Sequence, residues 1–236
     1  MIHLVYYCMK GSQYEYLIAQ EGKMRKEIDV GAWDRKEHFE YYSKISTPHY
    51  CIAFNIDITK LLYYTRKHHI SFYYSLIYLC TQSINSIDEF LLEIESNRVF
   101  KVNRRVPCFT DLRKNATAFH MVSLPCEGSL IEFATRSREE SQNHPLPVNA
   151  LAGLDEPQII YSCIPWADIT MYSNERDYND PKLKDDTTPI LVWGKYTQHG
   201  DKYMINMTLD VNHRLIDGYF VGLFVQKLEC MIEELD

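Results

Sequence analysis

The chain has 236 residues, of which 46% are hydrophobic and 24% are charged, and its formal net charge is −7. A chain of this length and hydrophobic content buries a sizeable core, and we predict a single domain over residues 29–236, after an N-terminal extension of unassigned role at residues 1–28. The acidic balance and the lack of a basic run argue against a nucleic-acid-binding protein, whose affinity depends on cationic side chains that neutralise phosphates.

The first predicted element is a helix. Asp34 and Glu37 have the spacing of a capping box, and Trp33 stands where a hydrophobic staple would, so we expect a helix from this point through about Lys44. Residues 49–58 follow it and predict a strand.

Two helices are expected next, a short one opened by Thr59 and a longer one opened by Ser71. The second is apolar nearly all round, which indicates a helix buried between layers. We then expect strands near residues 90–95, 98–102, 106–111 and 117–123, and a helix near residues 129–142.

The last third of the chain predicts the rest of the sheet. One strand reaches Ser162, and further sheet elements are expected near residues 166–172, 189–197 and 202–211. Apolar residues then recur at intervals of three and four, as on one buried face of a helix, at Val221, Phe224, Val225, Leu228, Met231 and Ile232. The mixed order of elements lacks a regular βαβ alternation, so we predict an α+β fold, a two-layer sandwich of helices on a large mixed β-sheet.

The cysteine pattern and the first residues of the chain indicate the cellular compartment in which we expect the protein. The seven cysteines are scattered and show no C-x-x-C or zinc spacing, so we expect free thiols in a reducing, cytoplasmic compartment. The first residues make a poor signal peptide, and no apolar stretch approaches the roughly 20 residues that span a bilayer. The histidines show no ligand pattern, so no metal is predicted.

The stretch Asn212-His213-Arg214-Leu215-Ile216-Asp217-Gly218 joins the last predicted strand to the last helix. Histidine is suited to accept and return a proton near neutral pH. Asp217 lies where the helix begins, so its simplest role is an N-cap. The spacing of His213 and Asp217 alone favours a structural role over a catalytic one, so the choice between the two roles depends on other residues.

Other motifs accompany this stretch in one order, namely Trp33-Asp34-Arg35-Lys36-Glu37-His38-Phe39-Glu40, Ile56-Asp57-Ile58-Thr59, Tyr161-Ser162-Cys163-Ile164-Pro165-Trp166 and Gly194-Lys195-Tyr196. From about Trp33 to the C-terminus the chain resembles the chloramphenicol acetyltransferase family, in which W-x-R-K-E-H-F, S-x-x-P-W, G-K-Y and H-H-x-x-x-D-G motifs recur. The final motif alone looks equally like the D-H-R-x-x-D-G of dihydrolipoamide acyltransferase catalytic domains, and the N-terminal motif separates the two families.

The resemblance implies an acetyl-CoA-dependent O-acetyltransferase that acts on chloramphenicol or a related small alcohol by direct transfer. His213 aligns with the catalytic base, and Asn212 stands where the family has a first histidine. Ser162 matches the donor to the oxyanion, and a hydroxyl can give that one hydrogen bond. Arg35 and Asp217 match a pair that holds the active-site loop in place.

The resemblance also implies binding positions and an assembly. The positions that line the coenzyme tunnel are matched by Trp166, Lys195, Tyr196 and Tyr73, and an aromatic ring beside a lysine suits an adenine and its phosphates. Acceptor-pocket positions are matched by Tyr41, Tyr42 and Phe119. Family members are homotrimers whose active sites lie between subunits, so a homotrimer is expected here.

Two features depart from the family. Val192 stands where the family has a threonine near the oxyanion, and valine donates no hydrogen bond. Residues 174–186 are charged where the family has an apolar segment at the acceptor site, and we expect them to form a solvated loop. Two alternatives therefore stay open: an acyltransferase with a different acceptor, such as a thiol, and a non-catalytic trimeric homologue.

Overall fold

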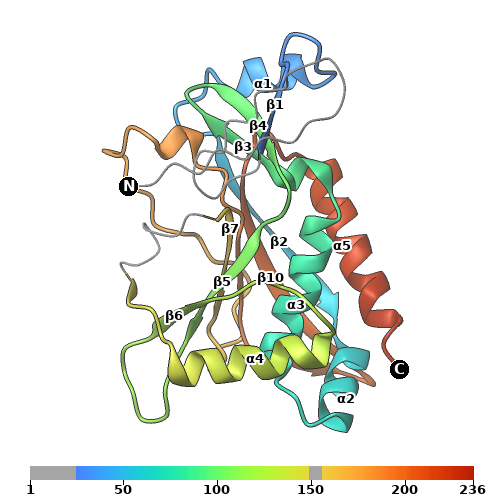
Figure 1. Ribbon diagram of the computed structural model, residues 1–236. Helices are drawn as coiled ribbons and strands as arrows, with labels where there is room; N and C mark the ends of the chain where they lie inside the picture. Colours follow the sequence, from blue (N-terminus) through green and yellow to red (C-terminus); the bar gives the residue numbers. More distant parts are fainter. Residues whose placement is uncertain (1–24, 149–155) are drawn as a thin grey trace, which may run out of the picture.

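The computed structural model describes residues 25–148 and 156–236 (Figure 1). Of the predicted N-terminal extension, residues 1–24 lie outside the described residues. In the first half the elements are β1 Arg25–Ile28, α1 Lys36–Tyr42, β2 His49–Asp57, α2 Thr59–Lys67, α3 Phe72–Asn85, η1 Asp88–Leu91, β3 Leu92–Glu95, β4 Arg98–Val102 and β5 Val106–Asp111. They continue with β6 His120–Ser123, α4 Leu130–Asn143, β7 Gln158–Cys163, η3 Leu183–Asp185, β8 Ile190–Trp193, β9 Thr197–His199, β10 Lys202–Asn212 and α5 Gly218–Glu233.

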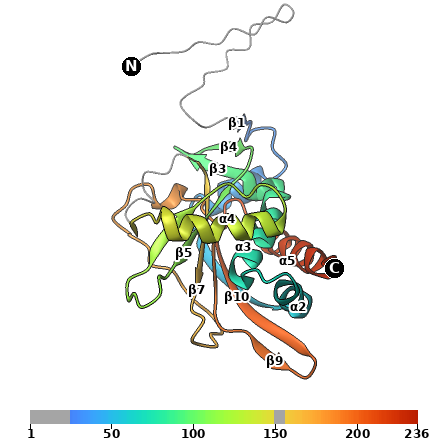
Figure 2. The same cartoon turned by 60° about the horizontal axis from the view of Figure 1, so that its bottom comes forward.

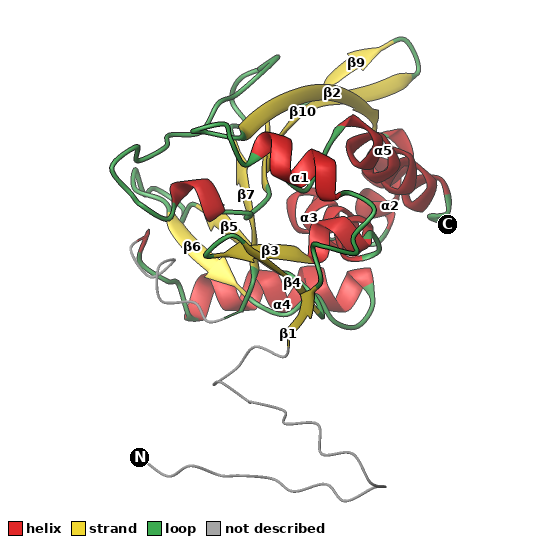
Figure 3. Ribbon diagram, turned by 90° about the horizontal axis from the view of Figure 1, so that it is seen from above, coloured by secondary structure: helices red, strands yellow, loops and turns green. Residues whose placement is uncertain are grey.

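The fold has two layers, as predicted. The large sheet has the strand order β2-β10-β8-β7-β5-β6, with β9 paired to β10, and a smaller sheet has the order β1-β4-β3. Strands β5, β7 and β8 run parallel, and the other pairs of the large sheet are antiparallel. Helix α2 lies on β10, α3 on β5, α4 on β6 and α5 on β2, so these helices cover one face of the sheet (Figure 3). The predicted α+β class is confirmed.

Strand β10 is buried on both of its faces. Met207 pairs with Phe54 of β2, whose ring meets Phe224 of α5, so the apolar side chains of β10 face the helices. The alternate residues Thr208 and Asp210 face the other way and are also buried. The segment that leads into β8 lies over this second face, whereas the β9–β10 hairpin projects from one end of the sheet (Figure 2).

The first helix begins differently from the prediction. Arg35 occupies the N-cap, and no side chain caps the helix, so the predicted capping box at Asp34 and Glu37 is wrong. The helix therefore begins one residue later than predicted, and the guanidinium of its N-cap residue is held by the distant Asp217 carboxylate. Trp33 nevertheless packs against this helix, with its ring centroid 6.1 Å from that of Phe39.

The predicted sheet element at residues 166–172 is also absent. After Ile164 donates to the Trp193 carbonyl at 2.9 Å, the chain leaves the sheet and passes the end of β8 as a loop. Gly194 permits this path, because a Cβ atom there would lie 2.6 Å from the Ala167 carbonyl oxygen. The same close approach interrupts the strand expected over 189–197, which is split into β8 and β9.

Within the two described ranges, no helix is long and apolar enough to cross a membrane.

Candidate active site

His213 lies just beyond the end of β10, between two aromatic rings. The Tyr42 ring stacks on the imidazole at a centroid distance of 3.8 Å, and the Tyr50 ring lies at 4.4 Å. The His213 backbone N–H donates to the Pro48 carbonyl at 2.7 Å. The end of α1 and the start of β2 therefore fix both the backbone and the ring of this histidine.

The environment of His213 favours its neutral form. Burial lowers its pKa below the usual 6.5, the negative charge of Asp217 opposes this, and the positive charge of Arg35 lowers the pKa further. Across the described ranges, neither ring nitrogen has a hydrogen bond to another residue. A half-buried, neutral imidazole with a free nitrogen is able to accept a proton from a bound molecule.

Asp217 has its two carboxylate oxygens occupied by other groups. It is the N-cap of α5, where Oδ1 accepts from the Tyr219 N–H at 3.0 Å, and Arg35 Nη2 donates to Oδ2 at 3.0 Å. Arg35 also lies over the Phe220 ring, 4.7 Å from its centroid. Burial raises the pKa of Asp217, but Arg35 and the backbone N–H donors outweigh it and lower the pKa overall. This carboxylate holds the loop, and its hydrogen bonds go to Arg35 and the Tyr219 N–H and not to the imidazole.

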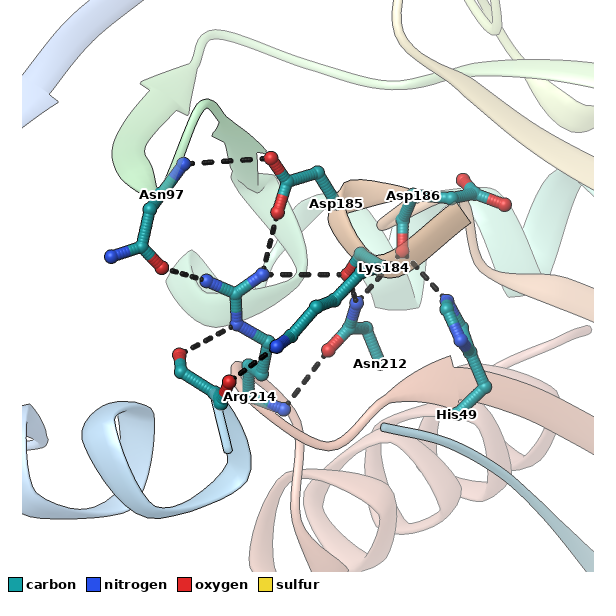
Figure 4. A network of polar contacts seen from close by, with 8 residues as sticks. His49, Asn97, Lys184, Asp185, Asp186, Asn212 and Arg214 are labelled. Atoms are coloured by element: carbon teal, nitrogen blue, oxygen red, sulfur yellow. Dashed lines mark hydrogen bonds and ion pairs between the residues drawn. The ribbon is translucent and has the colours of Figure 1, made fainter. Parts of the chain in front are cut away.

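The residues on both sides of His213 are clamped by the same short segment (Figure 4). Asn212 donates through Nδ2 to the carbonyls of Lys184 at 3.0 Å and Asp186 at 2.9 Å. Its Oδ1 accepts from the Arg214 backbone N–H at 3.0 Å. The loop that carries the histidine is therefore tied on its inner side to residues 184–186.

Arg214 is fully buried, and its guanidinium is almost completely paired. Nη1 donates to Asp185 Oδ1 at 2.6 Å, Nη2 to Asn97 Oδ1 at 2.5 Å and Nε to Ser43 Oγ at 2.9 Å (Figure 4). The guanidinium carbon also lies 4.6 Å from the centroid of the Phe39 ring. Arg214 thus joins the histidine loop to η3, to the β3–β4 turn and to the end of α1.

The expectation that residues 174–186 form a solvated loop is wrong for their charged anchors. The Arg176 side chain is 11% exposed and donates to Asp186 at 2.9 Å and to Asp210 at 2.7 Å, and the Asp210 side chain is 4% exposed. Asn174 donates to the same Asp210 carboxylate at 3.1 Å. The segment is charged because it meets a carboxylate on the second face of β10, which its sequence alone does not reveal.

Ser162 lies near the end of β7, in a second group of predicted residues. Its hydroxyl lies 3.2 Å from the Thr110 hydroxyl of β5, and its partner on the other side is Val192 of β8. The Tyr73 hydroxyl donates to the Thr110 carbonyl at 2.7 Å, and its ring packs 5.6 Å from the Trp193 ring. Burial raises the pKa of Tyr73 well above its usual value.

The other predicted coenzyme residues lie beyond the same end of β7 and β8. The Trp166 side chain is 75% exposed, and Lys195 is exposed as well. The Tyr196 ring meets the rings of Phe72 at 5.6 Å and Tyr203 at 5.9 Å, which fixes it in an aromatic cluster. Exposed aromatic and cationic side chains beside a fixed ring suit an external ligand with a base and phosphates.

One chain does not bring Ser162 and His213 together. Ser162 pairs with Val192, which pairs with Thr208, four residues before the end of β10 at Asn212. Four residues along a strand and two strand spacings separate the Cα atoms of Ser162 and Asn212 by roughly 16 Å. The structure therefore has two half-sites, the histidine half-site around His213 and the serine half-site around Ser162.

The predicted acceptor residues are divided between the half-sites. Tyr42 stacks on His213, and Tyr41, 62% exposed, lies edge-on to Tyr42 with ring centroids 5.0 Å apart. Phe119, 50% exposed, precedes β6 at the end of the sheet where Ser162 lies. All three rings are thus available to a ligand, but they do not form one wall within a single chain.

Sequence reasoning missed several residues of these half-sites, notably Tyr50, Arg214, Asn97 and Thr110. The position of Arg214 inside the motif was a signal of its importance, whereas nothing local to Asn97 marks its contact with a residue far along the chain. No group of three or more potential metal-binding side chains occurs in the described part of the chain.

Comparisons with known proteins show the family of this chain. The family model described as chloramphenicol acetyltransferase matches residues 24–229. Chloramphenicol acetyltransferase 3 of Escherichia coli is 26% identical over 208 residues, 86% of this chain and 94% of that protein. A chloramphenicol acetyltransferase of Clostridium perfringens is 28% identical over 205 residues, 86% of this chain and 92% of that protein.

Solved structures show the same fold. A chloramphenicol acetyltransferase structure gives a TM-score of 0.80 at 21% identity and covers 89% of this chain and 100% of that chain. The dihydrolipoamide acetyltransferase of Azotobacter vinelandii gives a TM-score of 0.62 at 14% identity, with 84% of this chain and 86% of that chain covered.

Asp217→Asn is expected to destabilise the protein by up to about 3 kcal/mol, because it leaves the part-buried Arg35 without its counter-ion. The folded pKa of Asp217 lies below the usual 3.8, so its contribution is complete above pH 3.8 and is lost as the pH falls through the folded pKa. Denaturant unfolding of both proteins from pH 7 to pH 2.5 should show a difference that shrinks at the acid end. An equal difference at every pH would contradict the ion-pair explanation.

Asp185→Asn is expected to cost about 2–4 kcal/mol, because the fully buried Arg214 loses its only carboxylate within the described chain. Glu175→Gln is the matched control, since it removes the same charge from an exposed position of the same segment. Thermal unfolding of the two variants checks this. Equal melting temperatures for both would show that Arg214 does not depend on Asp185.

Proposed function

We propose that this chain, which belongs to the chloramphenicol acetyltransferase family, transfers an acetyl group from acetyl-CoA to a hydroxyl of chloramphenicol or a related small alcohol. The protein is an acyltransferase, and its relatives carry the name chloramphenicol acetyltransferase over most of this chain. The acceptor, the general base and the subunit arrangement are our proposals.

The observation that carries the proposal is the state of His213. Its imidazole is held between Tyr42 and Tyr50, is kept neutral by burial, and has no hydrogen bond to another described residue. A base that removes a proton from an alcohol needs this combination of fixed orientation, neutral charge and a free nitrogen. The Arg35–Asp217 pair supports the loop and keeps its carboxylate away from the proton transfer.

The proposed reaction moves one proton out and back. His213 accepts the proton of the acceptor hydroxyl as that oxygen attacks the thioester carbonyl carbon. Ser162 donates a hydrogen bond to the carbonyl oxygen as negative charge develops there. When the carbon–sulfur bond breaks, His213 returns the proton to the thiolate of coenzyme A. The products are an acetyl ester and free coenzyme A, and no acyl-enzyme is needed.

Acetyl-CoA is the cosubstrate that the serine half-site suits. Trp166 and Lys195 are exposed beside the fixed Tyr196 ring, so an adenine and phosphates have an aromatic surface and a cation to meet. The Tyr73 hydroxyl is already donated to the Thr110 carbonyl, so we assign only the Tyr73 ring to the coenzyme.

The acceptor pocket is proposed to be aromatic. Tyr42 lies against the base, Tyr41 is next to it, and Phe119 lies beyond β5, so an acceptor with an apolar part has rings to pack on. The anchored segment 174–186 replaces the family's apolar acceptor segment, which supports a test of acceptors other than chloramphenicol.

The separation of the two half-sites supports a shared active site. With roughly 16 Å between Ser162 and the end of β10, the serine of one copy would need the histidine of another. We therefore propose a homotrimer with active sites between subunits.

The Azotobacter vinelandii dihydrolipoamide acetyltransferase was studied for the role of a serine, a histidine and an asparagine in catalysis. Its histidine and asparagine are four positions apart, as His213 and Asp217 are.

The alternatives are distinguished by ligand binding. A dihydrolipoamide-type enzyme would use a thiol acceptor, and a non-catalytic trimeric homologue need not bind acetyl-CoA. His213 is neutral and has no hydrogen bond to the described residues, which favours a catalytic protein over a scaffold, because a scaffold has no need of a free base. Calorimetric titration with acetyl-CoA, followed by a comparison of alcohol and thiol acceptors, separates the three.

His213→Ala is expected to lower the release of coenzyme A thiol from acetyl-CoA and chloramphenicol by about 10²–10⁴-fold. In the native protein, kcat/KM should be constant above pH 6.5 and should fall at lower pH with a midpoint below 6.5, because only the neutral imidazole accepts a proton. If the protein binds acetyl-CoA but chloramphenicol does not cause release of coenzyme A thiol, chloramphenicol is not the acceptor and another alcohol must be tested. Equal rates for both proteins would remove His213 as the base.

Mixing two inactive variants tests the shared site. His213→Ala and Ser162→Ala chains, unfolded and refolded together at equal amounts, would assemble hybrid trimers in which about a quarter of the interfaces carry both native residues. The expected result is recovery of about a quarter of the native rate, with each variant refolded alone as the control. A mixture as inactive as its parts, with trimers shown by light scattering, would place both residues in one subunit's site.

A further inference from the structure

The hydroxyl of Ser162 has one hydroxyl neighbour across the sheet. Ser162 of β7 and Thr110 of β5 lie on adjacent parallel strands, and their Oγ atoms are 3.2 Å apart. Either atom is able to donate in this contact. Both side chains are part-exposed on the face of the sheet opposite the helices, where a bound molecule can reach them.

On its other side, Ser162 has no polar neighbour in its register position. Its partner on β8 is Val192, which is 2% exposed and donates no hydrogen bond. Thr208, one strand further along, uses its Oγ1 to accept from the Tyr172 N–H at 3.1 Å. Within the described residues, Thr110 is therefore the hydroxyl that can orient Ser162.

Thr110 is itself held firmly. The Tyr73 hydroxyl donates to its carbonyl at 2.7 Å, and the Tyr73 ring packs edge-on to Phe109 with centroids 5.9 Å apart. Because Tyr73 belongs to α3, the backbone of Thr110 is fixed from the helix side of the sheet, and its hydroxyl projects from the other side. A fixed donor is what an orienting hydrogen bond requires.

We propose that Thr110 is a positioning residue, which donates to Ser162 Oγ and so directs the single Ser162 proton toward the thioester carbonyl oxygen. The proposal rests on the proposed acetyl transfer and concerns the same site. If Ser162 instead donated to Thr110, its only proton would be engaged there and could not form a hydrogen bond to the carbonyl oxygen as negative charge develops.

No proton is transferred along this pair. As the carbonyl oxygen becomes negative, the Ser162 hydrogen bond becomes charge-assisted and shorter, and the Thr110 hydroxyl compensates the polarised Ser162 oxygen. Thr110 keeps its own proton, and its proposed role is to orient Ser162. It therefore acts only through Ser162, and this dependence is measurable.

The test is a double-mutant cycle with the full-length protein. Thr110→Val replaces the hydroxyl by a methyl group of similar size, and we expect kcat for acetyl transfer to chloramphenicol to fall roughly 3- to 10-fold with the KM for acetyl-CoA unchanged. Thr110→Ser restores the hydroxyl and should restore the rate. In a Ser162→Ala background, Thr110→Val should have no further effect, because its target is gone. Thr110→Ala, which adds no methyl group next to Ser162, replaces Thr110→Val if the latter does not fold.

A second readout needs no acceptor. In the infrared spectrum of bound acetyl-CoA labelled with ¹³C at the carbonyl, the native protein should lower the stretching frequency relative to free acetyl-CoA. Thr110→Val should reverse part of this shift and Ser162→Ala most of it.

The outcomes separate the two proposals. A native protein that neither binds acetyl-CoA nor transfers its acetyl group overturns the proposed function and the role of Thr110 together. A native protein that binds acetyl-CoA, in which Thr110→Val leaves the rate and the carbonyl frequency unchanged or costs the same with and without Ser162, overturns the role of Thr110 alone. Loss of the effect in the Ser162→Ala background supports it.

Discussion

A buried cation next to the histidine determines how this end of the molecule is built. Desolvating a guanidinium is costly unless its donors are paired, and the Arg214 side chain has no exposed surface. Its partners come from segments far apart in the sequence, namely Ser43, Asn97 and Asp185. Each of these segments must therefore be in place before the charge is satisfied, so the ion pair couples the histidine loop to α1, to the small sheet and to η3.

This coupling explains why His213 has so little freedom. Its two sequence neighbours are bound to residues 184–186, and Tyr42, which stacks on the ring, immediately precedes the Ser43 that Arg214 contacts. Among the residues that the structure describes, the imidazole is thus held by the packing of its neighbours and not by a hydrogen bond of its own. A base oriented in this way keeps its unprotonated ring nitrogen available for an incoming proton, but its environment must be assembled from many parts.

The sequence predicted what depends on local pattern. The apolar residues of β10 and α5 and the N-cap roles of Ser71 and Asp217 follow from spacing, and the structure contains them. The sequence did not reveal that Arg35, at the N-cap of α1, pairs with a carboxylate 182 residues away. The burial of Arg176 was missed for the same kind of reason, since its contact with Asp210 is between distant segments. Charges that look solvated in sequence are buried here because their partners are not local.

Asn212 and residues 174–186, which both differ from the family pattern, meet in one contact. Asn212 replaces a histidine, and residues 174–186 replace an apolar segment, and the structure joins them: the Asn212 amide donates to the carbonyls of both Lys184 and Asp186. A primary amide has two N–H donors on one nitrogen and an oxygen that accepts, whereas an imidazole has its nitrogens on different sides of a ring. A histidine at position 212 could not make both of these bonds and also accept from the Arg214 N–H. The asparagine therefore matches the backbone of this segment, because its amide bonds two carbonyls that an imidazole could not bond together.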